Sequence, residues 1–189
     1  MQFTPNINER YAAALRNLIV RRLIKGENTK KNLRLLKIIL VFSSLCREEK
    51  ENVNVFENAQ NLLNAAALNF NKNEKNLTYS IKGEQGYKIN YSILKLLILE
   101  LASTPTQAKV YIKINLLEDR MIFTVQNAEP TKILKCLVKK LKGTLIKTRG
   151  ESNFSVMLSS PCVYNYESLI EDTQDYSDSF SAVNIMLSR

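Results

Sequence analysis

The sequence of 189 residues contains no histidine. Histidine is the side chain that enzymes use most often as a general base, because its ordinary pKa lies close to neutrality. Its absence excludes sites in which histidine activates a serine or a cysteine, and it excludes phosphoryl transfer through a histidine. We therefore assign no catalytic residue from the sequence.

Long apolar runs are also missing. A membrane-spanning helix needs about 18–20 consecutive apolar residues, and the densest apolar run, residues 38–42, is much shorter. The first ten residues, MQFTPNINER, lack the basic and then apolar pattern of a secretory signal. We expect a cytoplasmic protein that has no membrane partner.

Cysteines are few, and none has the spacing of a metal site. Cys46, Cys136 and Cys162 lie far apart in the chain. Three scattered thiols are typical of a protein in a reducing compartment, where they remain free. The sequence predicts no metal site and no cofactor.

Positive charge is abundant and unevenly distributed. The formal net charge is +9. The first cluster, our candidate partner-binding surface, contains Arg16, Arg21, Arg22, Lys30, Lys31 and Arg34. A second cluster spans residues 132–149. Basic surfaces attract nucleic acids or acidic proteins. Helix-turn-helix spacing and basic strands with interleaved aromatic residues are both missing, so we favour an acidic protein and consider nucleic acid unlikely.

Residues 1–50 are predicted to form a helical hairpin. Apolar residues recur at helical spacing over residues 7–25, Gly26 breaks the pattern, and a second helix is expected over residues 29–49. The second helix is apolar around nearly its whole circumference, so one partner helix cannot bury it. The hairpin either pairs with a second copy as a four-helix bundle or folds back onto its own sheet.

Residues 51–161 alternate between helical and strand patterns. Residues 48–52 are read as a charged connector, and helices are expected over residues 53–70, after residue 90 and over residues 131–141. Strands are expected over residues 77–81, 87–90, 110–115, 121–125, 144–148 and 154–158. This order predicts an α+β domain.

Residues 162–189 form a separate acidic tail. Its carboxylates are Glu167, Glu171, Asp172, Asp175 and Asp178. We expect one of two arrangements. Either the tail packs only in part, or it docks on a partner or on the basic body of the protein, for example over a ligand site.

The stretch over residues 90–131 resembles the ATP-binding domain of sensor histidine kinases. It reads NYSILKLLILELAST and then AKVYIKINLLEDRMIFTVQNAEPT. This domain belongs to the gyrase, heat-shock chaperone, histidine kinase and MutL group of ATPases. Its helix has the form D-x-x-x-L-x-x-x-L-x-N-L-x-x-N-A, and the following hairpin ends in D-N-G-x-G-I. Asn90 replaces the leading Asp, and Leu94, Ile98 and Leu101 fall on the apolar positions.

The sequence keeps the apolar frame of this domain but differs from it at the nucleotide-binding residues. Two of the changes lie on the helix and four lie after the hairpin. The degenerate positions are Glu100 and Thr104, which replace the two Asn residues of the helix, and Gln126, Asn127, Ala128 and Pro130, which fall on D-N-G-x-G.

These changes remove chemistry that ATP binding uses in the family. Gln126 is longer than Asp and uncharged, although its carbonyl can still accept a hydrogen bond from the amino group of adenine. Ala128 adds a Cβ and Pro130 removes a backbone donor where the family has glycines. Thr104 is a poor replacement for an amide that coordinates magnesium. Lys132 follows almost at once, which leaves no room for a glycine-rich lid. We expect no ATP hydrolysis and therefore no enzymatic activity.

The resemblance implies a helical hairpin followed by a histidine-kinase-ATPase-like two-layer α/β sandwich with a mixed sheet. It suggests a non-catalytic regulatory or scaffolding protein of bacterial signal transduction. Such a protein would form a homodimer through the hairpin and bind an acidic partner such as a response-regulator receiver domain. The alternatives are a divergent nucleotide-binding ATPase that uses Glu100, Gln126 and Asn127, and a basic regulator that binds nucleic acid.

Overall fold

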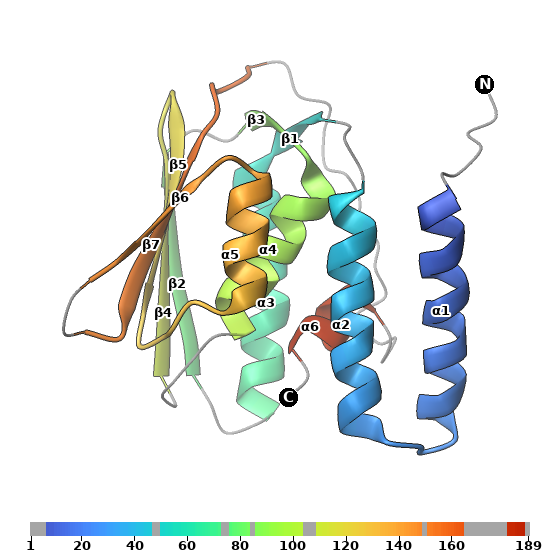
Figure 1. Ribbon diagram of the computed structural model, residues 1–189. Coiled ribbons are helices and arrows are strands. Elements are labelled where there is room, and N and C mark those ends of the chain that lie inside the picture. The colour runs from blue at the N-terminus through green and yellow to red at the C-terminus, as the bar shows by residue number, and fades with distance from the viewer. Residues whose placement is uncertain are drawn as a thin grey trace.

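The two N-terminal helices form the predicted hairpin. The protein was analysed as a computed structural model that describes residues 7–46, 50–72, 76–83, 86–103, 109–148, 151–164 and 181–187. Helix α1 (Ile7–Ile24) and helix α2 (Thr29–Leu45) lie side by side (Figure 1). Gly26 and Asn28 adopt positive φ angles of 73° and 41°, which reverse the chain between the helices.

A mixed five-stranded sheet forms one layer of the domain that follows. Its strands are β2 (Asn76–Gly83), β4 (Lys109–Leu116), β5 (Arg120–Gln126), β6 (Thr144–Lys147) and β7 (Asn153–Ser159), in the order β2-β4-β5-β7-β6. Strands β2 and β4 are parallel, and the other neighbouring pairs are antiparallel. Side chains alternate between buried and more exposed positions along β4, β5 and β7, so one face of the sheet is buried.

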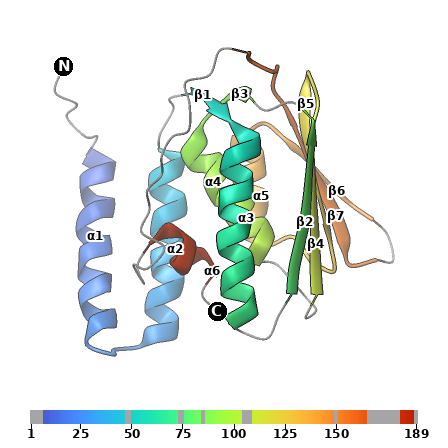
Figure 2. The ribbon, with the colours of Figure 1, turned by 180° about the vertical axis from the view of Figure 1, so that it is seen from behind.

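Three helices cover that face of the sheet. They are α3 (Val55–Lys72), α4 (Tyr91–Ser103) and α5 (Lys132–Lys140), and all lie on the same side of the sheet in both views (Figures 1 and 2). The predicted two-layer sandwich with a mixed sheet is confirmed. Asn90 caps α4 because its side-chain oxygen accepts a hydrogen bond of 3.1 Å from the Ile93 N–H.

One short strand was missed by the sequence prediction. Strand β1 (Glu51–Asn54) pairs antiparallel with β3 (Gly86–Ile89), whereas residues 53–54 were assigned to a helix and residues 51–52 to a connector. Helix α3 begins only after Asn54, because the Asn54 side chain accepts a hydrogen bond of 3.1 Å from the Glu57 N–H and caps the helix. Val53 is thereby buried in the core.

Helix α2 and the C-terminal helix α6 (Ala182–Leu187) form a further layer outside α3, α4 and α5. Helix α6 contacts α2, α3 and α4, and α2 contacts α4 and α5. Leu36 and Ile39 of α2 are buried with Ile185 of α6 in a small second core. The hairpin therefore folds back onto its own domain, and it packs on the helical layer rather than on the sheet (Figure 2). This contact buries part of the wide apolar surface of α2.

Two classes of feature are missing from the described ranges. None of the helices there combines the length and the apolar character needed to cross a membrane. The same residues contain no group of three or more cysteine or carboxylate side chains that could hold a metal ion.

Candidate functional site

Four of the degenerate positions lie where β5 ends and α5 begins, and Glu100 lies on α4. Gln126 is the last residue of β5 and is exposed, with Tyr111 and Asn153 as its neighbours across the sheet. Ala128 is 1% exposed, so its methyl group occupies space that a glycine would leave empty. Pro130 is half-buried. Thr104 lies outside the described residues.

The connection between β5 and α5 consists only of residues 127–131, and it is held at several points. Asn127, with a φ angle of 60°, donates from its backbone to the Asn153 side chain at 3.1 Å and from its side chain to the Lys109 carbonyl at 3.1 Å. The Ala128 N–H donates to the Ser152 carbonyl at 2.7 Å. The segment therefore follows the ends of the neighbouring strands and does not extend away from them as a lid.

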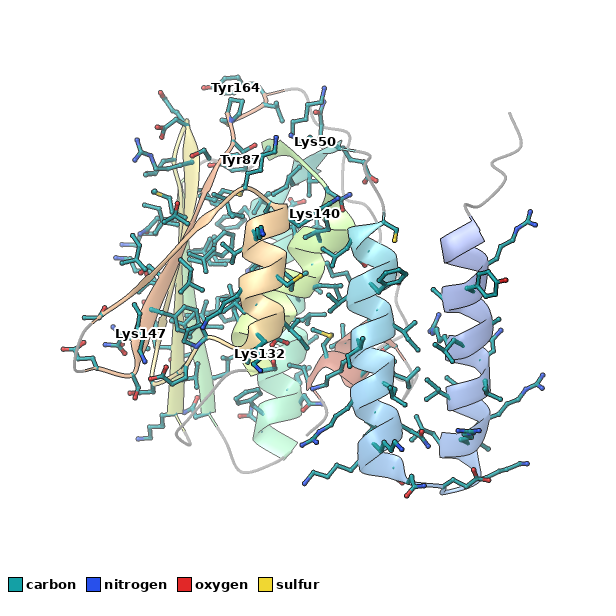
Figure 3. All side chains as sticks on the ribbon, in the orientation of Figure 1. Lys50, Tyr87, Lys132, Lys140, Lys147 and Tyr164 are labelled. Carbon is teal, nitrogen blue, oxygen red and sulfur yellow. The ribbon has the colours of Figure 1, made fainter. Side chains whose placement is uncertain are left out.

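An ion pair also joins the middle of this connection to β6. Glu129 forms an ion pair with Lys147 of β6, with 2.7 Å between the carboxylate oxygen and Nζ. Lys132 and Lys147 both lie in the lower half of the molecule (Figure 3). Both partners of the ion pair are solvent-exposed, so it contributes little to stability.

A buried carboxylate joins α4 directly to α5. Glu100 is 3% exposed, and one of its carboxylate oxygens accepts a hydrogen bond from the Thr131 hydroxyl. The other oxygen accepts a hydrogen bond of 3.2 Å from the Ser103 hydroxyl. Thr131 also caps α5, because its Oγ1 accepts a hydrogen bond of 3.0 Å from the Leu134 N–H. We call this arrangement of Glu100, Ser103 and Thr131 the α4–α5 contact.

The α4–α5 contact determines what chemistry the region can perform. Both oxygens of Glu100 already accept hydrogen bonds, and burial of a carboxylate is tolerated only with such partners. Thr131 and Ser103 therefore hold the Glu100 carboxylate in place between α4 and α5. The sequence indicated that Thr131 begins a helix, but its hydrogen bond to Glu100 spans 31 residues, and no local pattern predicted it.

The candidate partner-binding residues lie together at one end of the hairpin and along α1. Arg21 and Arg22 belong to the last turn of α1, whereas Lys30, Lys31 and Arg34 lie in the first turns of α2. These residues and Arg16 are all exposed. Figure 3 shows nitrogen-tipped side chains extending from this end of the hairpin into solvent. The structure thus gathers residues that the sequence separates by the turn.

The domain has the architecture of solved histidine kinases. The Acinetobacter baumannii histidine kinase AdeS superposes with a TM-score of 0.50 at 12% identity, over 82% of this chain and 97% of that chain. The nucleotide-free catalytic domain of histidine kinase ThkA also superposes with a TM-score of 0.50 at 12% identity, over 61% of this chain and 98% of that chain. At this identity the comparisons show a histidine-kinase-like fold. No protein-family model and no curated protein sequence matches the chain.

Proposed function

We propose that this protein with a histidine-kinase-like fold is a non-catalytic regulatory or scaffolding protein of bacterial signal transduction. It acts in the cytoplasm through a protein partner such as a response-regulator receiver domain, and it turns over no ATP. One observation carries the proposal: in the α4–α5 contact, both carboxylate oxygens of Glu100 already accept hydrogen bonds from the protein, and Glu100 falls on a nucleotide-binding position of the histidine kinase pattern. The absence of histidine supports it, because no phospho-accepting histidine is present.

The α4–α5 contact and the short connection between β5 and α5 both argue against nucleotide binding. A nucleotide at this place would have to displace the Thr131 hydroxyl from Glu100, which would leave a buried carboxylate without one of its partners. Such a loss costs about 1–3 kcal/mol, and more for a charged group. The five residues between β5 and α5 are also too few to wrap a triphosphate.

The exposed basic residues support an acidic protein partner. Receiver domains present a carboxylate-rich pocket, and complementary charge speeds the encounter of two proteins. Arg21 and Arg22 are exposed at the end of α1, where they can reach such a surface.

An uncovered apolar surface on the hairpin supports a homodimer. It comprises Tyr11, Leu15 and Leu18 of α1 and Ile38 and Phe42 of α2, with exposed fractions between 47% and 73%. A contiguous apolar surface of this kind marks a contact site when it is large. A second copy that supplies the same surface would complete a four-helix bundle, one of the two arrangements expected from the hairpin pattern.

The proposal is tested by measuring binding of purified receiver domains from the same genome, one at a time, to the full chain. The Arg21→Glu/Arg22→Glu variant should weaken the best pair at least about tenfold, because it reverses charge at the binding surface. The Lys139→Glu/Lys140→Glu variant makes the same charge change on α5 and is the matched control. The proposal fails if no receiver domain binds or if both variants weaken binding equally.

The same preparation separates the proposal from its alternatives. Release of phosphate from Mg-ATP by the full chain, abolished by Glu100→Gln, would establish the divergent ATPase instead. Retention on DNA that falls steeply with salt would establish a nucleic-acid-binding regulator, because such binding releases counterions from the phosphates.

A further inference from the structure

A pocket of about 350 Å³ lies between the hairpin and the domain. Helix α2 forms one wall, and the ends of α3, α4 and α6 form the others through Phe70, Ser103 and Leu187. We call it the α2 pocket. It shares Ser103 with the α4–α5 contact, but none of residues 126–131 line it.

One wall of the α2 pocket is cationic. Lys30, Arg34 and Lys37 line it, and they follow one another on α2 at spacings of four and three residues, which places them on one face of the helix. No acidic residue is among the described residues that line the pocket. In the described part of the chain, Lys30 and Arg34 have no ion-pair partner.

The backbone of α2 adds to this positive potential. Lys30 lies in the first turn of the helix, where the helix dipole is also positive, and this turn contains no acidic residue. Cations at this end of a helix are unfavourable unless negative charge is nearby. Glu100 is the buried carboxylate at the end of α4, but it accepts hydrogen bonds from Thr131 and Ser103. An anion in the pocket would relieve this unfavourable arrangement.

The remaining walls are apolar. Leu33, Phe70 and Leu187 line the pocket, and the last two are 6% and 8% exposed. Ser103 donates its hydroxyl proton to oxygens of Glu100, so it offers an acceptor rather than a donor to a ligand. The pocket thus combines an aromatic and aliphatic floor with a cationic wall.

We propose that the α2 pocket binds a small organic phosphate with an apolar, preferably aromatic, body. Binding pockets for small molecules have volumes of about 300–1,000 Å³, and they join apolar walls to a few polar groups that fix orientation. A phosphate ester has close to two negative charges and three acceptor oxygens, which match several converging cations better than a single carboxylate does. The apolar body would lie on Phe70 and the two leucines.

Binding at this place would connect elements that are distant in the sequence. A ligand that contacts both Arg34 of α2 and Phe70 of α3 holds the hairpin against the domain. Because it binds the folded protein alone, it raises the melting temperature as its concentration increases.

The test is a calorimetric titration of the full chain with phenyl phosphate as the probe, with inorganic phosphate and phenol as its two separate halves. We expect saturable binding of phenyl phosphate that is at least about tenfold tighter than binding of either half. Absence of saturable binding up to ~10 mM, or equal binding of inorganic phosphate, would overturn the proposal.

Two variants locate the binding. Arg34→Gln should weaken phenyl phosphate about tenfold or more, because it removes a cation that lines the pocket. Lys31→Gln removes the same charge from an exposed neighbour on α2 that does not line the pocket, and it should change the affinity less than about threefold. Equal weakening by both variants would show that only the general charge of the hairpin matters and would overturn the proposal. The titration contains no receiver domain, so its outcome is independent of the receiver-domain test.

Discussion

Helices α4 and α1 show how differently apolar residues are used in this protein. Helix α4 has eleven buried residues among its thirteen, because the sheet lies on one side of it and α2 and α6 lie on the other. Among the described side chains of α1, only Ala12 and Ile19 are buried. The difference indicates that α4 holds the fold together, whereas α1 leaves most of its apolar and basic side chains exposed.

The largest effect is expected from a truncation inside α4. Leu97 is 0% exposed, so Leu97→Ala leaves a cavity and should lower the free energy of unfolding by about 2–5 kcal/mol. The matched change on α1, Leu15→Ala, removes a half-exposed side chain and should cost less than about 0.5 kcal/mol. Urea unfolding of both variants measures this contrast, and equal losses would show that the two helices do not differ in this way.

The α4–α5 contact should give the next largest effect. Thr131→Ala removes the cap of α5 and one hydrogen bond to buried Glu100, so unfolding should become easier by about 2 kcal/mol. Thr131→Ser keeps the hydroxyl and is the control. A Ser variant as unstable as the Ala variant would mean that packing of the threonine methyl, and not the hydrogen bond, joins α4 to α5.

A smaller loss is expected where the chain enters β6. A Cβ at Gly143 would lie 2.3 Å from Leu158 Cδ2 and 2.8 Å from the Met157 carbonyl oxygen, so Gly143→Ala should cost about 1–2 kcal/mol. In the hairpin turn, a Cβ at Gly26 meets nothing within 4 Å, and Gly26→Asn, which tolerates a positive φ, should cost less than about 0.5 kcal/mol. Thermal unfolding should rank the two variants in this order, and the reverse ranking would contradict the packing at Gly143.

On α1 the expected change is in assembly rather than in folding. Leu18 is 48% exposed, so Leu18→Ser should leave the unfolding free energy of one chain nearly unchanged. If the uncovered surface of the hairpin joins two copies, the variant should sediment as a monomer where the unaltered protein sediments as a dimer. A dimer of equal strength in both proteins would place the contact elsewhere.

The smallest effect is expected at the exposed turn between β4 and β5. The hydrogen bond from Arg120 lowers the pKa of Asp119. A lowered folded-state pKa adds stability above the unfolded pKa of about 3.9, and this stability is lost as pH falls through the folded-state pKa. The melting temperatures of the protein and of Asp119→Asn should therefore differ slightly at pH 7 and converge in acid. A difference that grows in acid would reverse the expected sign.

Sequence patterns predicted the elements whose signals are local. The alternation over residues 110–115 and 121–125 predicted β4 and β5, and the helical spacing of Leu94, Ile98 and Leu101 predicted α4. Strand β1 was missed because its four residues, ENVN, have no apolar alternation of their own and pair with β3 more than 30 residues away.

The features that define the candidate sites depend on distant contacts. The sequence singled out Glu100 and indicated that Thr131 begins a helix, but only folding brings their side chains together. Lys30 and Arg34 were assigned to an exposed charged surface, and the structure places both at a pocket that includes Phe70 and Leu187. Periodicity indicates which face of a helix is apolar, but it does not indicate which element covers that face.

The central claim is that the protein keeps a histidine-kinase-like frame without a working nucleotide site. The most direct measurement is a thermal-shift titration of the Arg34→Gln variant of the chain with Mg-ATP, because this variant weakens any contribution of the α2 pocket. The account predicts no saturable shift and no release of phosphate. Saturable stabilisation of about 1 kcal/mol or more that Glu100→Gln abolishes would contradict it, because nucleotide would then occupy the region of the α4–α5 contact.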